Sequence, residues 1–213
     1  MRPPQSWSSA RLTLGLAALT VAAWAIAALF GLGDRAVLWG GFIPADFAAD
    51  LPFARAPASL TPLTATLVHG DLFHLLFNIV ILLVCGRAIE PVLGRASLAV
   101  LYAAGAYGAA AAHYFAHPGS VVPAVGASGA VSAVIGAYAL LFGRQKLKVA
   151  NPTLALLLNA LWLLAAWVAL QLIIGFGVAF ATGEPLGIAA HVGGFLAGLL
   201  LAYPLLLLRY RKA

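Results

Sequence analysis

The sequence predicts an all-α membrane protein, a six-transmembrane-helix bundle in a single domain spanning residues 1–213. The chain is 63% hydrophobic and only 8% charged, whereas a soluble domain carries about 25% charged residues. Its mean hydropathy is +1.01. Six apolar stretches approach the roughly 20 residues that a helix needs to cross the hydrocarbon core. They lie near residues 12–32, 71–89, 96–116, 124–143, 153–180 and 187–208.

The first stretch, 12–32, is longer than the roughly 7–15 apolar residues of a signal-peptide core, so we expect it to be retained as a helix. The long connection over 33–70 is rich in proline and aromatic residues. Because aromatic side chains suit the headgroup interface, we expect this outer loop to be partly embedded in the outer leaflet and packed on the bundle. An ordinary outer loop is the alternative. Its aromatic residues include Trp39, Phe42, Phe47 and Phe53.

The remaining stretches are joined by short connections, which indicates a compact bundle. Their many glycine and alanine residues are typical of membrane helices, which pack closely through small side chains. The stretch over 153–180 is longer than spanning requires, so we expect it to tilt or to extend beyond the membrane.

The distribution of basic residues predicts the orientation of the chain. With the N-terminus in the cytoplasm and the helices alternating, all 12 lysines and arginines except Arg35 and Arg55 fall on the inner side. This positive-inside bias predicts that both termini are cytoplasmic. The net charge of +6 is therefore interpreted as a topology signal, and we expect no nucleic-acid partner.

Polar residues inside the apolar stretches are costly to bury in lipid and are therefore functional candidates. From the helical rise of 1.5 Å per residue, Asn78, Ser128 and His191 each lie roughly 8–10 Å below the outer surface. Three separate stretches thus bring these residue types to one depth. The full set is His74, Asn78, His113, Ser128, Ser132, Asn159, Gln171 and His191.

Two stripes of small residues carry the serine and the histidine. One stripe includes Ser128, Ser132 and Gly136, and the other includes His191 and Gly194, at helical spacing. Small stripes let two membrane helices approach closely. If the stripes face each other, Ser128 and His191 come within hydrogen-bond reach.

A serine hydroxyl becomes a useful nucleophile when a base takes its proton, and neutral His191 is suited to that role. An oxyanion needs hydrogen-bond donors, for which Asn78, His74 and the backbone N–H of Ser128 are candidates. None of the acidic residues lies in an apolar stretch beside His191, so we expect a Ser–His dyad rather than a triad. The alternative is that Ser128 is a packing residue. We expect Ser132, Asn159 and Gln171 to be structural.

Other protease and metal motifs are absent or incomplete. The stretch 31–34 reads GLGD, but chemistry with paired aspartates would need a second aspartate in the membrane. No HExxH sequence occurs, which excludes the zinc proteases that use it. His113 and His117 are spaced to bind a metal in principle, but we expect them to be interfacial, and we expect no metal site.

Four segments resemble the rhomboid intramembrane serine proteases in their six-helix bacterial form. They are HGDLFHLLFN (69–78), GRAIEPVLG (86–94), GASGA (126–130) and AHVGGFLAG (190–198). The resemblance covers roughly residues 12–208. It implies that Ser128 is the nucleophile, that His191 is the general base, and that His74 and Asn78 hold the oxyanion.

The resemblance also implies transmembrane protein substrates cleaved near the outer face, no cofactor, and a multi-pass location in the bacterial inner membrane, in contact with its lipid. Both general shedding and rhombosortase-like processing fit it, and the oligomeric state is left open. Two alternatives are an inactive rhomboid-like chaperone or adaptor and a transporter or channel. The presence of both dyad residues and both oxyanion candidates argues against the first, and the lack of charged midplane residues argues against the second.

The chain departs from the family pattern at two places. Residues 60–62 read Leu-Thr-Pro where many members carry Trp-Arg in the first loop, so the loop needs a different anchor. Ser132 stands where some members place an aromatic residue under the histidine. Another group must therefore orient His191, and the sequence does not identify it.

Overall fold

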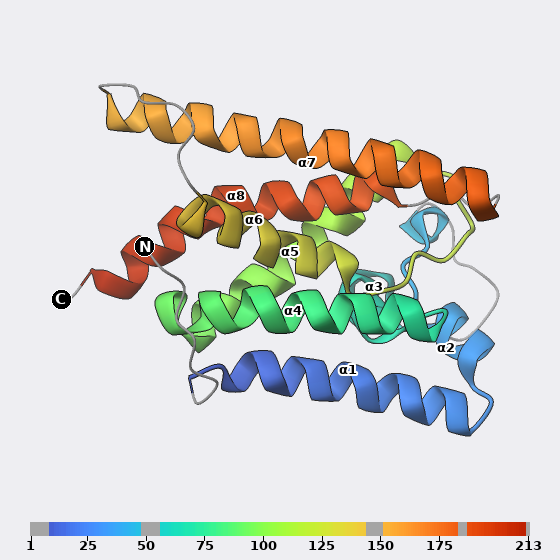
Figure 1. Ribbon diagram of the computed structural model, residues 1–213. Helices are drawn as coiled ribbons and strands as arrows, with labels where there is room; N and C mark the ends of the chain where they lie inside the picture. The colour runs from blue at the N-terminus through green and yellow to red at the C-terminus, as the bar shows by residue number, and fades with distance from the viewer. Residues whose placement is uncertain (1–8, 48–55, 144–150, 183–186, 212–213) are drawn as a thin grey trace.

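The computed structural model describes residues 9–47, 56–143, 151–182 (for 176–182 only the backbone) and 187–211. Within them, long antiparallel helices run back and forth through the molecule (Figure 1), and no residue forms a β-strand, which confirms the all-α prediction. The long helices are α1 (Arg11–Leu29), α4 (Leu72–Leu93), α5 (Arg95–Ala116), α6 (Ser128–Phe142), α7 (Pro152–Thr182) and α8 (Ile188–Tyr210).

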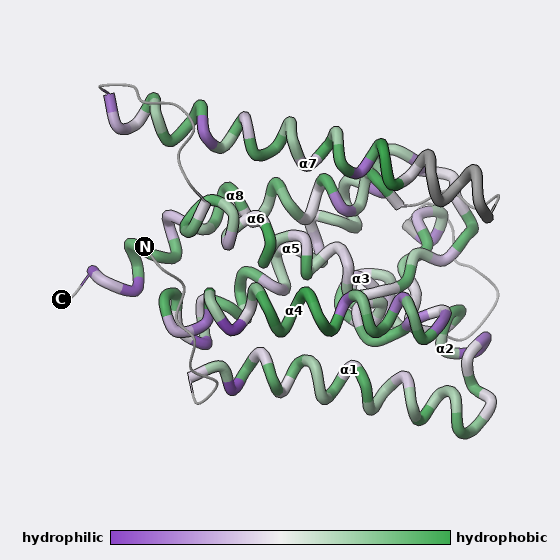
Figure 2. The backbone as a smooth tube through the Cα atoms, in the orientation of Figure 1, coloured by the Kyte–Doolittle hydropathy of each residue, from purple (hydrophilic) through white to green (hydrophobic). Residues whose placement is uncertain are grey.

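Four helices in the described part of the chain are long and apolar enough to cross a membrane: α1, α4, α8 and the part Pro152–Gly175 of α7. The apolar helix α6 is shorter. Figure 2 shows hydrophobic residues predominating along these helices, and large apolar side chains stand exposed on them, with Phe77 69% and Ile173 71% exposed. Because water would penalise such surfaces, the chain is a multi-pass membrane protein.

The alternating helix directions agree with the predicted topology. The start of α1 and the end of α8 lie at the same end of the bundle, at the left of Figure 1. A crossing by all six long helices and the cytoplasmic placement of the termini stay predictions.

Helix α6 begins at Ser128, and the predicted start near residue 124 is therefore wrong. The preceding backbone is bonded elsewhere: Ala124 exchanges hydrogen bonds of 2.8 and 2.9 Å with Phe42, and the Gly126 N–H donates to the Ala65 carbonyl at 2.9 Å. Gly126 has φ +111°, a conformation that glycine adopts without strain. Ser128 therefore lies on the first turn of its helix.

The other predicted bounds agree with the structure to within about two residues, except at the ends of two helices. Helix α1 ends at Leu29, before residue 32, because Gly31 turns the chain with φ +63°. Helix α4 runs on past residue 89 to Leu93 and ends at Gly94, which has φ +85°.

Helix α8 packs between α5 and α6 through glycine residues. A Cβ atom at Gly194 would overlap the carbonyl of Gly129, and one at Gly198 would overlap the carbonyl of Ala133. On the adjoining face of α8, Gly193 lies against the carbonyl of Gly108 in α5. The facing of the two small stripes at α6 and α8 is thus confirmed, and it brings two helix backbones into direct contact.

The first loop is built from short helices packed on the bundle. The Phe42–Ala124 pair and the bond from Ala45 N–H to the Ser120 carbonyl at 3.0 Å tie it to the segment before α6, while the Tyr107 hydroxyl of α5 donates to the Ser59 carbonyl at 2.8 Å. Phe53 lies outside the described residues, and embedding in the leaflet stays a prediction. The elements are α2 (Gly33–Gly40), η1 (Pro44–Phe47), η2 (Ala58–Leu60), α3 (Thr61–Thr64) and η3 (Ala65–Leu67).

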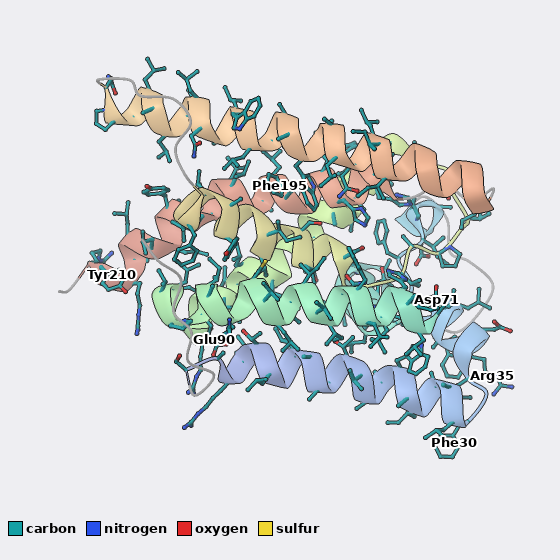
Figure 3. The ribbon with its side chains drawn as sticks, in the orientation of Figure 1. Phe30, Arg35, Asp71, Glu90, Phe195 and Tyr210 are labelled. Atoms are coloured by element: carbon teal, nitrogen blue, oxygen red, sulfur yellow. The ribbon has the colours of Figure 1, made fainter. Side chains whose placement is uncertain are left out.

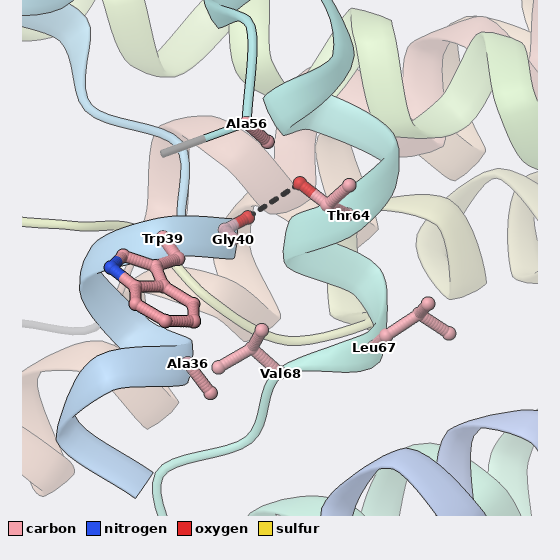
Figure 4. Close-up of a pocket in the computed structure, with 7 residues that line it drawn as sticks. All are labelled: Ala36, Trp39, Gly40, Ala56, Thr64, Leu67 and Val68. Atoms are coloured by element: carbon pink, nitrogen blue, oxygen red, sulfur yellow. Dashed lines mark hydrogen bonds between the residues drawn. The ribbon is translucent and has the colours of Figure 1, made fainter. Parts of the chain in front are cut away.

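Within this loop, the Thr64 hydroxyl donates to the Gly40 carbonyl at 2.7 Å and joins α3 to α2 (Figure 4). An apolar pocket opens beside this bond, lined by Trp39, Leu67 and Val68 among others. None of the residues that line it is a site candidate. The hydrogen bonds within the loop, and those from the loop to the bundle, hold in place a loop that lacks the Trp-Arg pair.

Glu90 joins α4 to the start of α1, at the left of Figure 3. Its side chain is 1% exposed and accepts bonds from the backbone N–H of Leu12 at 2.9 Å and of Thr13 at 2.8 Å. It also accepts the Thr13 hydroxyl at 2.8 Å. The first N–H groups of a helix have no acceptor within it, so Glu90 caps α1 from another helix. Its negative charge also interacts favourably with the positive end of the α1 dipole.

We expect Glu90→Ala to lower the free energy of unfolding by more than about 2 kcal/mol, because several buried donors lose their acceptor. Denaturant unfolding of the purified protein in detergent measures the change. Arg95→Ala is the control: its side chain is 59% exposed and lies 3.8 Å from the carboxylate, so its loss should cost less than about 1 kcal/mol. Equal effects of the two variants would contradict the capping role.

Candidate active site

The structure brings Ser128 and His191 together, although they are 63 residues apart in the chain. Ser128 Oγ lies 2.8 Å from His191 Nε2. Ser128 is the first residue of α6, and His191 is in the first turn of α8. One turn after His191, Gly194 rests on the carbonyl of Gly129, the residue that follows the serine. The glycine contact therefore sets the spacing between the hydroxyl and the imidazole.

Gln171 of α7 contacts the other nitrogen of the same ring. Its Oε1 lies 2.9 Å from His191 Nδ1. An amide oxygen can only accept, so this bond requires hydrogen on Nδ1 and leaves Nε2 free to accept the Ser128 hydroxyl. The sequence interpretation placed Gln171 among the structural residues. A signal was present, because a buried amide in a membrane helix is costly, but nothing in the sequence paired it with His191.

The backbone of His191 is bonded to α7 as well. Trp167 Nε1 donates to the His191 carbonyl at 3.3 Å, and the indole stacks on Phe195 of α8 with ring centroids 4.9 Å apart and planes 9° apart. Figure 3 shows Phe195 between α7 and α8. The histidine is thus held at its ring and at its main chain by one neighbouring helix.

His74 and Asn78 lie on α4, which begins where the Asp71 side chain accepts the His74 N–H at 2.9 Å. The His74 ring lies against Gly126, where a Cβ atom would meet its Nε2 at 2.5 Å. It is therefore close to the segment that leads into α6, the helix of Ser128. Asn78 is 3% exposed, and its Nδ2 donates to the His74 carbonyl at 2.9 Å. The same nitrogen carries a second hydrogen. The oxyanion roles of both residues stay predictions.

Sequence reasoning missed His69, which precedes α4. It is 6% exposed, and its ring packs edge-on against His74 with centroids 4.9 Å apart. Its Nε2 accepts the Ala127 N–H at 3.4 Å, immediately before α6. Burial, and then the neighbouring His74, lower the pKa of His69 from 6.5 to about 4. His69 lies outside the apolar stretches, so depth and stripe arguments did not select it.

The structural roles predicted for Ser132 and Asn159 and the interfacial role predicted for the His113–His117 pair stay predictions. Ser132 and Asn159 are each 2% exposed, and the two histidine rings have centroids 5.2 Å apart. In the described part of the chain no three histidine, cysteine or acidic residues are grouped to hold a metal ion.

A model of the Rhomboid domain matches residues 59–208, well over half of the chain. The search of curated proteins found no match to the chain. The matched range contains Ser128, His191, His74 and Asn78.

The low pKa of His69 predicts a pH dependence of stability. The unfolded chain binds a proton at His69 near pH 6.5, whereas the folded protein does so only near pH 4. The unfolded state therefore holds more protons between these values, and stability present above pH 6.5 is lost as the pH falls towards 4. Unfolding in detergent as a function of pH measures this loss. His69→Gln keeps an acceptor but does not titrate here, so it should lose less stability over the window; an identical profile would contradict the assignment.

Proposed function

The chain belongs to the rhomboid family, and from that premise we propose that it is an intramembrane serine endopeptidase that cleaves transmembrane proteins with a Ser128–His191 dyad. Members of this family are generally proteases of this kind. The observation that carries the proposal is the 2.8 Å approach of Ser128 Oγ to His191 Nε2. A packing serine would have no need of an imidazole base on a different helix.

In the first step, the Ser128 hydroxyl attacks the carbonyl carbon of the scissile peptide bond. Its proton passes to His191 Nε2, which the Nδ1–H tautomer leaves available. The carbonyl π electrons move to its oxygen, giving a tetrahedral intermediate with one negative charge. His191 then carries the matching positive charge.

Donors around Ser128 stabilise that oxyanion. Ser128 is the first residue of α6, so its N–H has no acceptor inside the helix. It lies at the positive end of the helix dipole, where an anion is stabilised. The second amide hydrogen of Asn78 and a ring N–H of His74 are the side-chain donors. Each is held by α4, which packs beside α6, so little reorganisation is needed when the charge forms.

The intermediate collapses when His191 gives its proton to the leaving amine, and the peptide C–N bond breaks. An acyl ester on Ser128 remains. Water then attacks the ester while His191 takes one of its protons, and the returning proton restores the serine hydroxyl. No acidic residue takes part.

The position of the dyad indicates where a substrate is cut. Ser128, His191 and His74 lie within the first turns of α6, α8 and α4, and these helices begin at the same end of the bundle (Figure 1). Cleavage therefore takes place near one membrane face rather than at the midplane. With the N-terminus in the cytoplasm, as the basic residues predict, that face is the outer one.

We expect Ser128→Ala and His191→Ala each to abolish cleavage of a labelled transmembrane substrate by the purified protein in detergent. Mass spectrometry should also find a fluorophosphonate probe attached to Ser128 in the unaltered protein. Ser132→Ala, one turn further along α6, is the matched control and should keep most of the activity. Equal cleavage by the unaltered protein and Ser128→Ala would contradict the proposal. A folded protein that the fluorophosphonate probe does not label at Ser128 would favour the inactive adaptor.

Asn78→Ala should lower kcat by roughly 10²-fold or more, as expected when one oxyanion donor is lost. Substrate binding should change much less, because the donor acts on charge that develops in the transition state. The measurement is kcat and KM against the same substrate, with Asn159→Ala as the control for removing a buried amide elsewhere. A small loss would remove Asn78 from the oxyanion site.

A further inference from the structure

We propose that Gln171 is a positioning residue for catalysis, which fixes the tautomer and the ring plane of His191 from helix α7. This inference rests on the proposed Ser128–His191 chemistry and adds a third side chain to it. The observation is the 2.9 Å approach of Gln171 Oε1 to His191 Nδ1, on the opposite side of the ring from the serine.

The two contacts together define one state of the imidazole. A neutral ring carries hydrogen on either Nδ1 or Nε2, and only a ring with its hydrogen on Nδ1 can donate to Gln171 and also accept from Ser128. The other tautomer would place a lone pair against the amide oxygen and a hydrogen against the hydroxyl. Gln171 thus selects the form of His191 that is able to remove the Ser128 proton.

The contact also persists through the proton transfer. Once His191 Nε2 is protonated, both ring nitrogens carry hydrogen, and Gln171 Oε1 still accepts from Nδ1. The amide dipole then faces a cation, which lowers the free energy of the charged intermediate. Gln171 does this without adding a charge of its own, whereas an ionised carboxylate would be expensive to bury at this depth.

Helix α7 is built to hold Gln171 in place. The side chain is 5% exposed, so its conformation is restricted by packing. Trp167 lies one turn earlier on the same face of the helix, bonds the His191 carbonyl at 3.3 Å and stacks on Phe195. These contacts fix α7 against α8 next to the amide, so the position of Gln171 relative to the imidazole is set by more than one bond.

Kinetics test the role in catalysis. Gln171→Leu keeps the approximate volume but offers no acceptor, and should lower kcat roughly 10- to 100-fold with KM little changed, which is part of what a general base contributes. Gln171→Glu restores an acceptor oxygen and should regain part of the activity that Gln171→Leu loses, but it should stay below the unaltered protein because a buried carboxylate is costly and carries a charge. Asn159→Leu is the matched control on α7: its Oδ1 is buried and without a hydrogen-bond partner in the described structure, so kcat should be retained.

Solid-state nitrogen NMR of the ¹⁵N-histidine-labelled protein tests the tautomer without relying on activity, with the His191 signal assigned from its loss in His191→Gln. We expect hydrogen on Nδ1 in the unaltered protein and in Gln171→Glu, and loss of that preference in Gln171→Leu. An unchanged tautomer or an unchanged kcat in Gln171→Leu would overturn this inference while leaving the dyad intact. If Ser128→Ala cleaved as well as the unaltered protein, the proposed function would fail instead, and the NMR result would still decide whether Gln171 sets the tautomer.

Discussion

The direct contact between the backbones of α6 and α8 is the constraint on which the rest of the structure depends. A Cβ atom at Gly194 or Gly198 would overlap a carbonyl of α6, so larger side chains would move the two helices apart. Hydrogen bonds form only within a narrow range of donor–acceptor distances, so the 2.8 Å contact of Ser128 with His191 would be lost. In lipid, where apolar contact gives little net drive for helix association, such close approach also supplies the packing energy that holds the bundle together.

Polar contacts between helices add to this packing at both ends of the molecule. Glu90 of α4 accepts hydrogen bonds from the first N–H groups of α1. His69 accepts a hydrogen bond from the N–H of Ala127, just ahead of α6. Beside Ser128, Gln171 of α7 accepts a hydrogen bond from Nδ1 of His191 on α8. Each group would be costly to leave without a partner away from water. The contacts therefore define which helix ends meet, as well as stabilising them.

The sequence predicted the helices and the closeness of Ser128 and His191 because both depend on periodic features. Apolar runs, small stripes and the depth of Ser128 and His191 follow from helical geometry alone. The start of α6 was wrong because the segment before it bonds to Phe42 and Ala65, which are distant in sequence. Gln171 and His69 were missed for the same reason: each acts through a partner on another element, and a single sequence carries no record of which helices are neighbours.

The convergence of helix starts explains why a neutral amide suits this site. Helices α4, α6 and α8 begin at one end of the bundle, and each start carries partial positive charge. In the proposed mechanism, that charge favours an oxyanion beside Ser128 and opposes a positive charge on His191. A carboxylate partner would favour the imidazolium strongly and would compensate for the helix ends before any oxyanion exists. An amide oxygen orients His191 without adding a charge of its own, so in the proposed mechanism the favourable field remains available for the charge that develops during the reaction.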